Sequence, residues 1–194
     1  MIDLAQDVDG LPSSIDVVGR MVRVRPLSID DASALYDRYF SDEQCARFLL
    51  RERHRSLDKT IEIIRKLAAP ASPAGRRLFG LTIECNETVQ PVGLLTCISF
   101  EVQIEVHYGV SRRCWGKSLA NEALQLASDA FLALDRFKRV YTVCAVENQA
   151  SLRVLEKAGF RRERHCPECF VLPALGDARQ DGYLYAKYLL TQSL

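Results

Sequence analysis

The chain has 194 residues, enough for one domain with a core of its own, and contains no run of 18 or more apolar residues that could span a membrane. Hydrophobic residues make up 48% of it and charged residues 26%, which is the composition of an ordinary folded protein. The formal net charge of +1 gives no general attraction to nucleic acid, so we expect neither nucleic acid nor a membrane among its partners.

The beginning of the chain has no feature of an export signal. Residues 1–14 are acidic and polar, and we expect them to form a flexible tail ahead of a single domain over residues 15–194. Without such a signal, we expect a cytoplasmic protein in which the seven cysteines are reduced thiols.

The first half of the chain alternates between strand and helix patterns. Strands are predicted where apolar residues alternate with polar ones, and helices where apolar residues recur on one face behind a capping side chain. In chain order we expect a short strand turned at Gly19, a strand at 21–25, a helix capped by Ser28 or Asp30 and running through Tyr39, a helix capped by Ser56, and an antiparallel hairpin of strands at 76–84 and 90–100.

The second half repeats a strand–helix order, which together with the hairpin predicts an α/β fold with a mixed sheet. The strand at 104–110 alternates strictly, whereas the strand at 139–146 is so apolar that we expect both of its faces to be buried. The remaining expected elements are a helix from residue 119 to Leu134, a helix from Asn148 to Gly159, a strand near Phe160, a loop at 173–181 and a last strand at 182–190.

The stretch Ser111–Leu124, SRRCWGKSLANEAL, places a glycine where the strand at 104–110 turns into a helix. The first amide groups of a helix lack acceptors within it and carry partial positive charge, which attracts phosphate. Gly116 lets the backbone approach a ligand closely, and Arg112, Arg113 and Lys117 add positive charge. A plain strand-to-helix turn would explain Gly116 equally well, because the spacing matches neither a Walker A loop nor a Rossmann fingerprint.

The segments IEVHYGVSRRCWGKSLANEAL (104–124) and VENQASLRVLEKAGF (146–160) together resemble the GNAT superfamily of acetyl-CoA-dependent N-acetyltransferases. The likeness is greatest to the branch that includes the ribosomal-protein acetyltransferases RimJ and RimL, and it covers roughly residues 15–190. It implies a mixed, mostly antiparallel sheet flanked by helices. Within this sheet the strands at 104–110 and 139–146 would splay apart and form the cleft for CoA.

The resemblance also implies which residues hold the coenzyme. The family's pyrophosphate loop maps onto residues 113–118, where Ser118 departs from the usual glycine or alanine and would pay for a positive φ angle. Backbone groups near Val110 would contact the pantetheine arm, as would Asn148. The full set of expected coenzyme contacts is Val110, Arg113, Cys114, Trp115, Gly116, Lys117, Ser118, Leu119, Ala120 and Asn148, with no metal.

Acetyl transfer to an amine requires a base, a donor to the developing oxyanion, and protonation of the leaving thiolate. Glu105, on the polar face of its strand, matches a glutamate of the family and is the candidate base, with His107 as the alternative. Ser151 matches a serine proposed as the acid, although it could equally serve only to start its helix. Tyr183 and Tyr185 on the last strand could also donate to sulfur, but aromatic residues there are usually core.

Several alternatives stay open. The HCPEC segment has too few partners for zinc, and Cys114 has no neighbouring base in the sequence, so direct attack in a ternary complex is expected. The acceptor could be a protein N-terminus or a small amine; residues 51–55, RERHR, could line its site with positive charge or form a solvated loop. A non-catalytic acyl-CoA-binding module is the alternative function, and either a monomer or a homodimer is compatible with the sequence.

Overall fold

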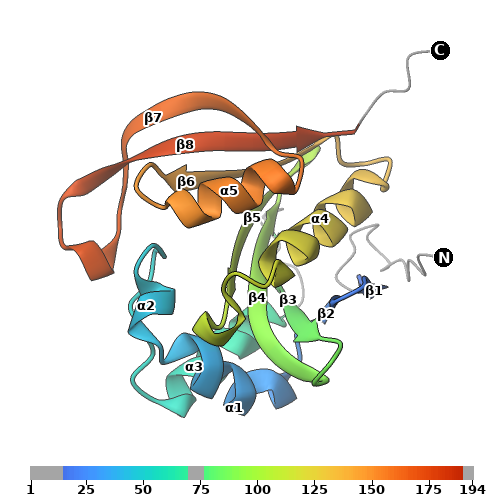
Figure 1. Cartoon of the computed structure of the whole chain (residues 1–194), viewed down its shortest axis with the longest axis vertical. Coiled ribbons are helices and arrows are strands. Elements are labelled where there is room, and N and C mark those ends of the chain that lie inside the picture. The colour runs from blue at the N-terminus through green and yellow to red at the C-terminus, as the bar shows by residue number, and fades with distance from the viewer. Residues whose placement is uncertain (1–14, 70–76, 190–194) are drawn as a thin grey trace.

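The computed structural model describes residues 15–69 and 77–189; the expected flexible tail at 1–14 lies outside these ranges. Within them, eight strands form one sheet in the order β1-β2-β3-β4-β5-β6-β8-β7 (Figure 1). All neighbours are antiparallel except β5 and β6, which confirms the mixed, mostly antiparallel sheet. The strands are β1 Val17–Val18, β2 Val22–Pro26, β3 Arg77–Cys85, β4 Gln90–Ser99, β5 Gln103–Val110, β6 Arg139–Ala145, β7 Arg161–Val171 and β8 Arg179–Tyr188.

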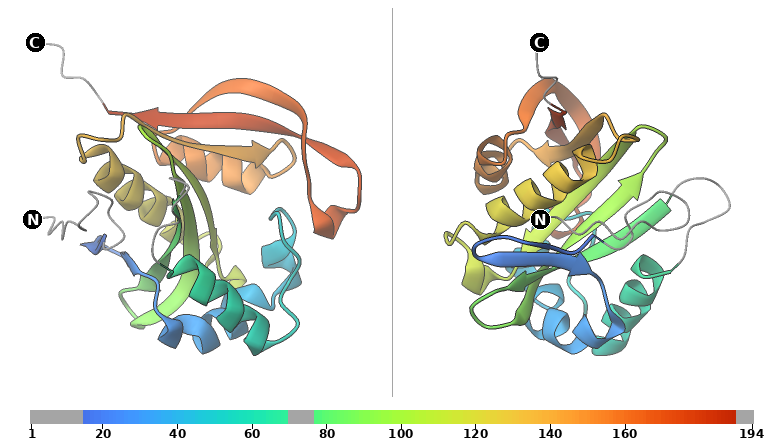
Figure 2. Two further views of the ribbon diagram at one scale, coloured as in Figure 1. Left: turned by 180° about the vertical axis from the view of Figure 1, so that it is seen from behind. Right: turned by 90° about the vertical axis from the view of Figure 1, so that its right-hand side faces the viewer.

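Helices cover both faces of this sheet, as predicted (Figure 2). The two apolar clusters lie on opposite sides of β4, because Leu95 belongs to the cluster under α4 and its neighbour Leu94 to the cluster under α1 and α3. No helix of the described ranges is both long and apolar enough to cross a membrane. The α-helices are α1 Ala32–Leu35, α2 Glu43–Ala46, α3 Leu57–Leu67, α4 Leu119–Leu132 and α5 Gln149–Lys157, with short helical turns η1 Ile29–Asp31, η2 Tyr36–Phe40, η3 Arg112–Cys114 and η4 Pro173–Leu175.

Local signals placed the helix starts correctly. The Ser56 hydroxyl accepts a hydrogen bond from the Lys59 amide at 3.2 Å, and the Asn148 side chain accepts one from the Ser151 amide at 3.2 Å. Of the two proposed caps for the first helix, Ser28 is the one used, because its hydroxyl accepts from the Asp30 amide. The helix expected to run through Tyr39 is not uniform: one α-helical turn passes into the π-helical turn η2.

Two boundaries and one burial pattern differ from expectation. The final strand begins at Arg179, so the loop before it is shorter than predicted, and the strand near Phe160 is the 11-residue β7. The strand at 139–146 was expected to be buried on both faces, and this is wrong. Tyr141 and Val143 are only half-buried, because α1 and α3 pack mainly against β4 and β3 and leave that face of β6 partly uncovered.

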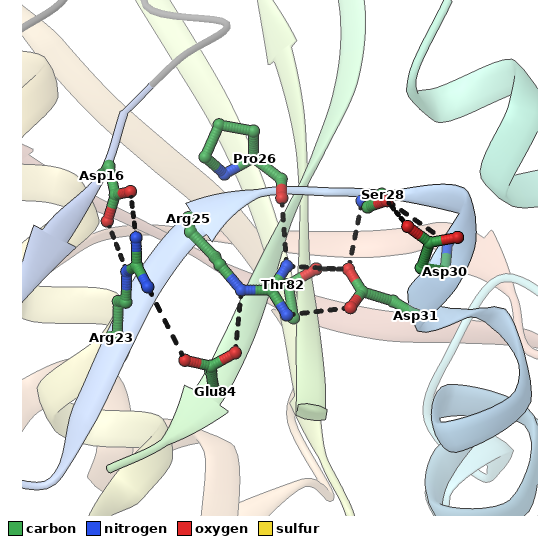
Figure 3. A network of polar contacts seen from close by, with 9 residues as sticks. All are labelled: Asp16, Arg23, Arg25, Pro26, Ser28, Asp30, Asp31, Thr82 and Glu84. Carbon is green, nitrogen blue, oxygen red and sulfur yellow. Dashed lines mark hydrogen bonds and ion pairs between the residues drawn. The ribbon is translucent and has the colours of Figure 1, made fainter. Parts of the chain in front are cut away.

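A buried polar network joins β2, β3 and η1 (Figure 3). The Arg25 guanidinium donates two hydrogen bonds to the Asp31 carboxylate, at 2.9 and 2.8 Å, and one to Glu84 at 2.9 Å. Asp31 also accepts from the Thr82 hydroxyl at 2.7 Å and from the Ser28 amide at 3.0 Å. Every polar atom of the Asp31 side chain is therefore paired, as a buried charge requires.

Candidate active site

The strands β5 and β6 separate partway along their length. They pair in parallel only from Gln103 opposite Arg139 to Glu105 opposite Tyr141. Beyond Glu105, β5 continues to Val110 against β4 alone, while β6 continues against β8. The two strands thus splay apart as predicted, and the edge of β5 after Glu105 is not covered by β6.

A cavity of about 460 Å³ opens at this free edge of β5. Tyr108 and Gly109, which point to opposite faces of the strand, both line it, so the cavity passes around the strand edge. Of the predicted site residues, those that line it are Val110, Cys114, Trp115, Gly116, Ser118, Leu119, Ala120, Asn148 and Ser151, whereas Glu105, Arg113 and Lys117 do not.

The turn between β5 and α4 is built from two residues with left-handed backbone conformation. Gly116 has a φ of 75°, and no atom would lie within 4 Å of a Cβ placed on it, so the glycine is required by the backbone and faces open space. Ser118 has a φ of 62°, which is the costly positive angle that the resemblance to the family's loop suggested for this serine. Its hydroxyl makes no capping bond to α4. The first amides of α4 are therefore left for a ligand, which suits an anion.

The indole of Trp115 folds back over the strand end. Its Nε1–H donates to the Val110 carbonyl at 3.1 Å, and the Cys45 thiol lies 3.6 Å from the same oxygen. The Val110 carbonyl is thus engaged within the protein. Any ligand contact at Val110 would have to use its other atoms.

The start of α5 forms the opposite wall of the cavity. The Ser151 hydroxyl lies 2.7 Å from the Tyr108 hydroxyl, which also donates to the Ser151 carbonyl at 3.1 Å. Burial raises the pKa of Tyr108, more than the Ser151 hydrogen bond lowers it, so the phenol is neutral and a donor. Cys144 lies beside the pair, and burial raises its pKa to about 11.

Tyr108 is the polar group that sequence reasoning missed. Strand alternation assigned it only to the apolar face of β5, and its partner lies 43 residues later in the chain. The available signal was the residue type, since a tyrosine on a buried face needs a partner for its hydroxyl.

The two candidate bases are bonded to each other on the other face of β5. His107 Nε2 lies 2.8 Å from Glu105 Oε1, and the Tyr141 hydroxyl donates to Glu105 Oε2 at 3.2 Å. Glu105 does not line the cavity, but it occupies the last paired position before β5 and β6 separate. Gly109, two residues beyond His107 on the same face, does line it.

The two thiols that line the cavity are poor nucleophiles. Burial raises the pKa of Cys114, outweighing the nearby Lys117. Burial, reinforced by Asp42, raises the pKa of Cys45 to about 11. Both are therefore neutral at pH 7, and the thiolate that a covalent acetyl-enzyme would need is scarce.

A metal centre is not formed by the part of the chain that the structure describes. No cluster of three or more His, Cys, Asp or Glu side chains in those ranges could hold an ion. The polar groups at the cavity or beside it include amide donors, hydroxyl groups and the Glu105–His107 pair.

Comparison with known proteins identifies the family of this chain. The profile of the acetyltransferase (GNAT) domain matches residues 22–161. The uncharacterized N-acetyltransferase YoaA of Bacillus subtilis is 25% identical over 142 residues, covering 72% of this chain and 79% of its own.

Solved structures share the fold at low identity. An acetyltransferase of the GNAT family from Bacillus anthracis has a TM-score of 0.78 and 20% identity, covering 90% of this chain and 98% of its own. The ribosomal L7/L12 acetyltransferase RimL in complex with coenzyme A has a TM-score of 0.77 and 17% identity, over 89% of this chain and 97% of its own. With the family profile spanning most of its length, the chain belongs to the GNAT family of N-acetyltransferases.

Proposed function

We propose that this enzyme transfers the acetyl group of acetyl-CoA to a primary amine by direct attack in a ternary complex. The observation that carries the proposal is the cavity at the free edge of β5, walled by the left-handed turn at Gly116 on one side and by Ser151 on the other. It offers amide donors for a diphosphate and hydroxyl groups for a thiolate at the two ends of one space.

The coenzyme would bind with its pyrophosphate over the turn at residues 113–118. The uncapped amides of Leu119 and Ala120 and the side chains of Arg113 and Lys117 would meet its negative charge. The pantetheine arm would run along β5 toward Asn148, whose side-chain oxygen already caps α5 and whose NH₂ group is left to donate. Residues 15–194 would act as one domain, as a monomer or homodimer in the cytoplasm.

The reaction would use both faces of β5. Glu105, or His107 bonded to it, would take the proton of the attacking amine. A backbone N–H would stabilise the oxyanion that forms on the thioester. Ser151, hydrogen-bonded to Tyr108, would donate to the leaving sulfur. The neutral Cys114 and Cys45 support direct transfer without an acetylated cysteine.

The acceptor would be a protein N-terminus or a small amine. Motif similarity and the fold shared with RimL support a place in the RimJ/RimL-like branch, for which a protein N-terminus is the first acceptor to try. The alternative is an acyl-CoA-binding module of the same fold without turnover.

Release of free CoA tests the choice between these functions. The protein would be mixed with acetyl-CoA and a panel of peptide N-termini, amino acids, polyamines and aminoglycosides, and the thiol product measured over time. Turnover on an amine supports the enzyme. Binding of acetyl-CoA without turnover on any amine would favour the module, and failure to bind it would overturn both.

Reversing one charge at the turn should weaken coenzyme binding. We expect Lys117→Glu to raise the Kd for acetyl-CoA about 30-fold at low salt, since an exposed charge a few ångströms from a phosphate contributes about 1 kcal/mol and the reversal counts twice. Lys138→Glu makes the same charge change at an exposed position outside the cavity and should leave Kd unchanged. Calorimetric titration measures both, and equal affinities would contradict this placement of the pyrophosphate.

The Tyr108–Ser151 pair should matter for turnover more than for binding. We expect Ser151→Ala to lower kcat by about 10²-fold, because a positioned acid contributes at least that much. Tyr108→Phe keeps the aromatic ring and leaves Ser151 in place, but removes the hydroxyl that is hydrogen-bonded to Ser151. We therefore expect a smaller loss of kcat. Steady-state kinetics with the best acceptor measures both, and unchanged kcat in Ser151→Ala would remove the serine from the mechanism.

A further inference from the structure

Two cysteines that the proposed acetyl transfer does not use lie close together on β7. Cys166 and Cys169 are free and both half-buried. The strand bulges between them: Cys166 pairs with Gly182, and pairing resumes only at Phe170, so three residues of β7 lie opposite the single residue Asp181. The bulge therefore contains the Cys-Pro-Glu-Cys segment.

The backbone of this segment has a proline followed by a left-handed residue, the order in which a type II turn uses its second and third positions. Pro167 occupies the second position, which fits its fixed φ, and Glu168 in the third position has a φ of 44°. Such a turn holds its first and last Cα atoms within about 7 Å. A disulfide needs Cα atoms roughly 4.4–6.8 Å apart, a separation that a turn of this kind makes accessible to Cys166 and Cys169.

Both thiols belong to the same face of the hairpin. Residues paired across antiparallel strands direct their side chains to one side, so the Cys166 side chain lies on the side where Gly182 would carry a Cβ. The Cys169 sulfur lies 2.9 Å from that same Cβ position. Gly182 thus leaves space on the face of the hairpin that both cysteine side chains share.

Hydrogen bonds from β8 hold the turn in this shape. The Glu168 amide donates to Asp181 Oδ1 at 2.9 Å, and the Arg179 guanidinium donates to the Glu168 carbonyl at 2.6 Å. A left-handed glutamate costs on the order of 1 kcal/mol or more and persists only where its surroundings fix it. These bonds therefore hold the segment between the two cysteines in one conformation in the reduced protein.

We propose that Cys166 and Cys169 form a dithiol site that a low-molecular-weight disulfide, such as oxidised glutathione, converts to an intramolecular disulfide. One cysteine thiolate attacks a glutathione sulfur, forming a mixed disulfide and releasing one reduced glutathione. The other cysteine then displaces the second glutathione, forming the Cys166–Cys169 bond. Two protein thiols are oxidised and one glutathione disulfide is reduced to two thiols.

The test uses the full chain, reduced, freed of reductant and incubated with oxidised glutathione, then alkylated and cleaved with trypsin. Cleavage after Arg164 and Arg179 puts both cysteines on one peptide, residues 165–179. We expect that peptide to carry no alkyl group and to be lighter by two hydrogen atoms, and full alkylation of both sites to return after reduction. A peptide alkylated twice, carrying two glutathiones, or joined to a second chain would overturn the proposal.

Single variants separate the two steps. Cys169→Ser is expected to accumulate glutathione on Cys166 and Cys166→Ser to accumulate it on Cys169, because neither has a second thiol to complete the exchange. Cys85→Ser/Cys114→Ser should form the disulfide as the original chain does. Neither Cys166 nor Cys169 lines the cavity, so unchanged acetyl-CoA binding in the single variants reports an intact fold. Absence of glutathione adducts from both single variants would count against thiol exchange at this site.

Discussion

Replacing Glu105 with glutamine is expected to lower kcat by about 10²- to 10⁴-fold, the range that a positioned general base contributes, while the Kd for acetyl-CoA stays unchanged. Glutamine has the same length and can keep hydrogen bonds to His107 Nε2 and the Tyr141 hydroxyl, which the carboxylate contacts at 2.8 and 3.2 Å. It cannot accept the amine's proton. Steady-state release of CoA with a saturating amine measures the loss.

His107→Gln is the matched control for this experiment. It removes the other titratable group of the pair and leaves the carboxylate bonded to Tyr141. If Glu105 is the base, His107→Gln lowers kcat by less than Glu105→Gln does. The double variant then has the same kcat as Glu105→Gln alone, because the effects of groups that act as a unit are not additive. Full activity of Glu105→Gln beside an inactive His107→Gln would transfer the role to the histidine.

The position of Glu105 fits this role although it does not line the cavity. Side chains of β5 alternate, so Glu105 and Tyr108 point to opposite faces of the strand. A thioester whose sulfur reaches Tyr108 and Ser151 would present its carbonyl at the strand edge, which the cavity rounds at Gly109. An amine arriving from the Glu105 side of the strand would then approach one face of that carbonyl, with the base beside it.

Much of the fold could be predicted because the signals are local. The alternation at residues 104–110 reflects one buried face of a strand. The capping side chains of Ser56 and Asn148 each bind an amide only three residues further along the chain. The turn at Gly116 was predicted because its signal is also local: a glycine stands directly between a strand pattern and a helix pattern. The positive φ of Ser118, identified as costly from the sequence, is present all the same.

The features that the sequence did not reveal depend on distant partners. The hydroxyl of Tyr108 meets Ser151, 43 residues away, and Arg25 meets Glu84, 59 residues away. No periodicity of the strand or helix encodes such pairs. The partly uncovered face of β6 was missed for the same reason: composition shows how apolar a strand is, but only packing decides which helices cover it.

Replacing Asp31 with asparagine is expected to lower the free energy of unfolding by about 3–5 kcal/mol, since it leaves the Arg25 guanidinium buried with one carboxylate fewer. The side chain of Asp31 is only 6% exposed and that of Arg25 only 17%, so water cannot replace the lost interaction. Asp30→Asn, one residue earlier and exposed, should change stability by less than about 0.5 kcal/mol. Urea unfolding at pH 7 measures both, and similar losses would contradict the assignment.

The Asp31 carboxylate should also make the free energy of unfolding depend on pH. Burial alone would raise the pKa of Asp31, but hydrogen bonds from Arg25, Thr82 and the Ser28 amide together lower it below the ordinary value. Because the folded pKa lies below the unfolded one, near 3.9, the stabilisation is complete above that value and is lost as pH falls further, through the folded pKa. The stability gap between the original chain and Asp31→Asn should therefore be constant from pH 8 to about 5 and narrow below about pH 4. A gap that instead narrowed near neutral pH would place the titrating group elsewhere.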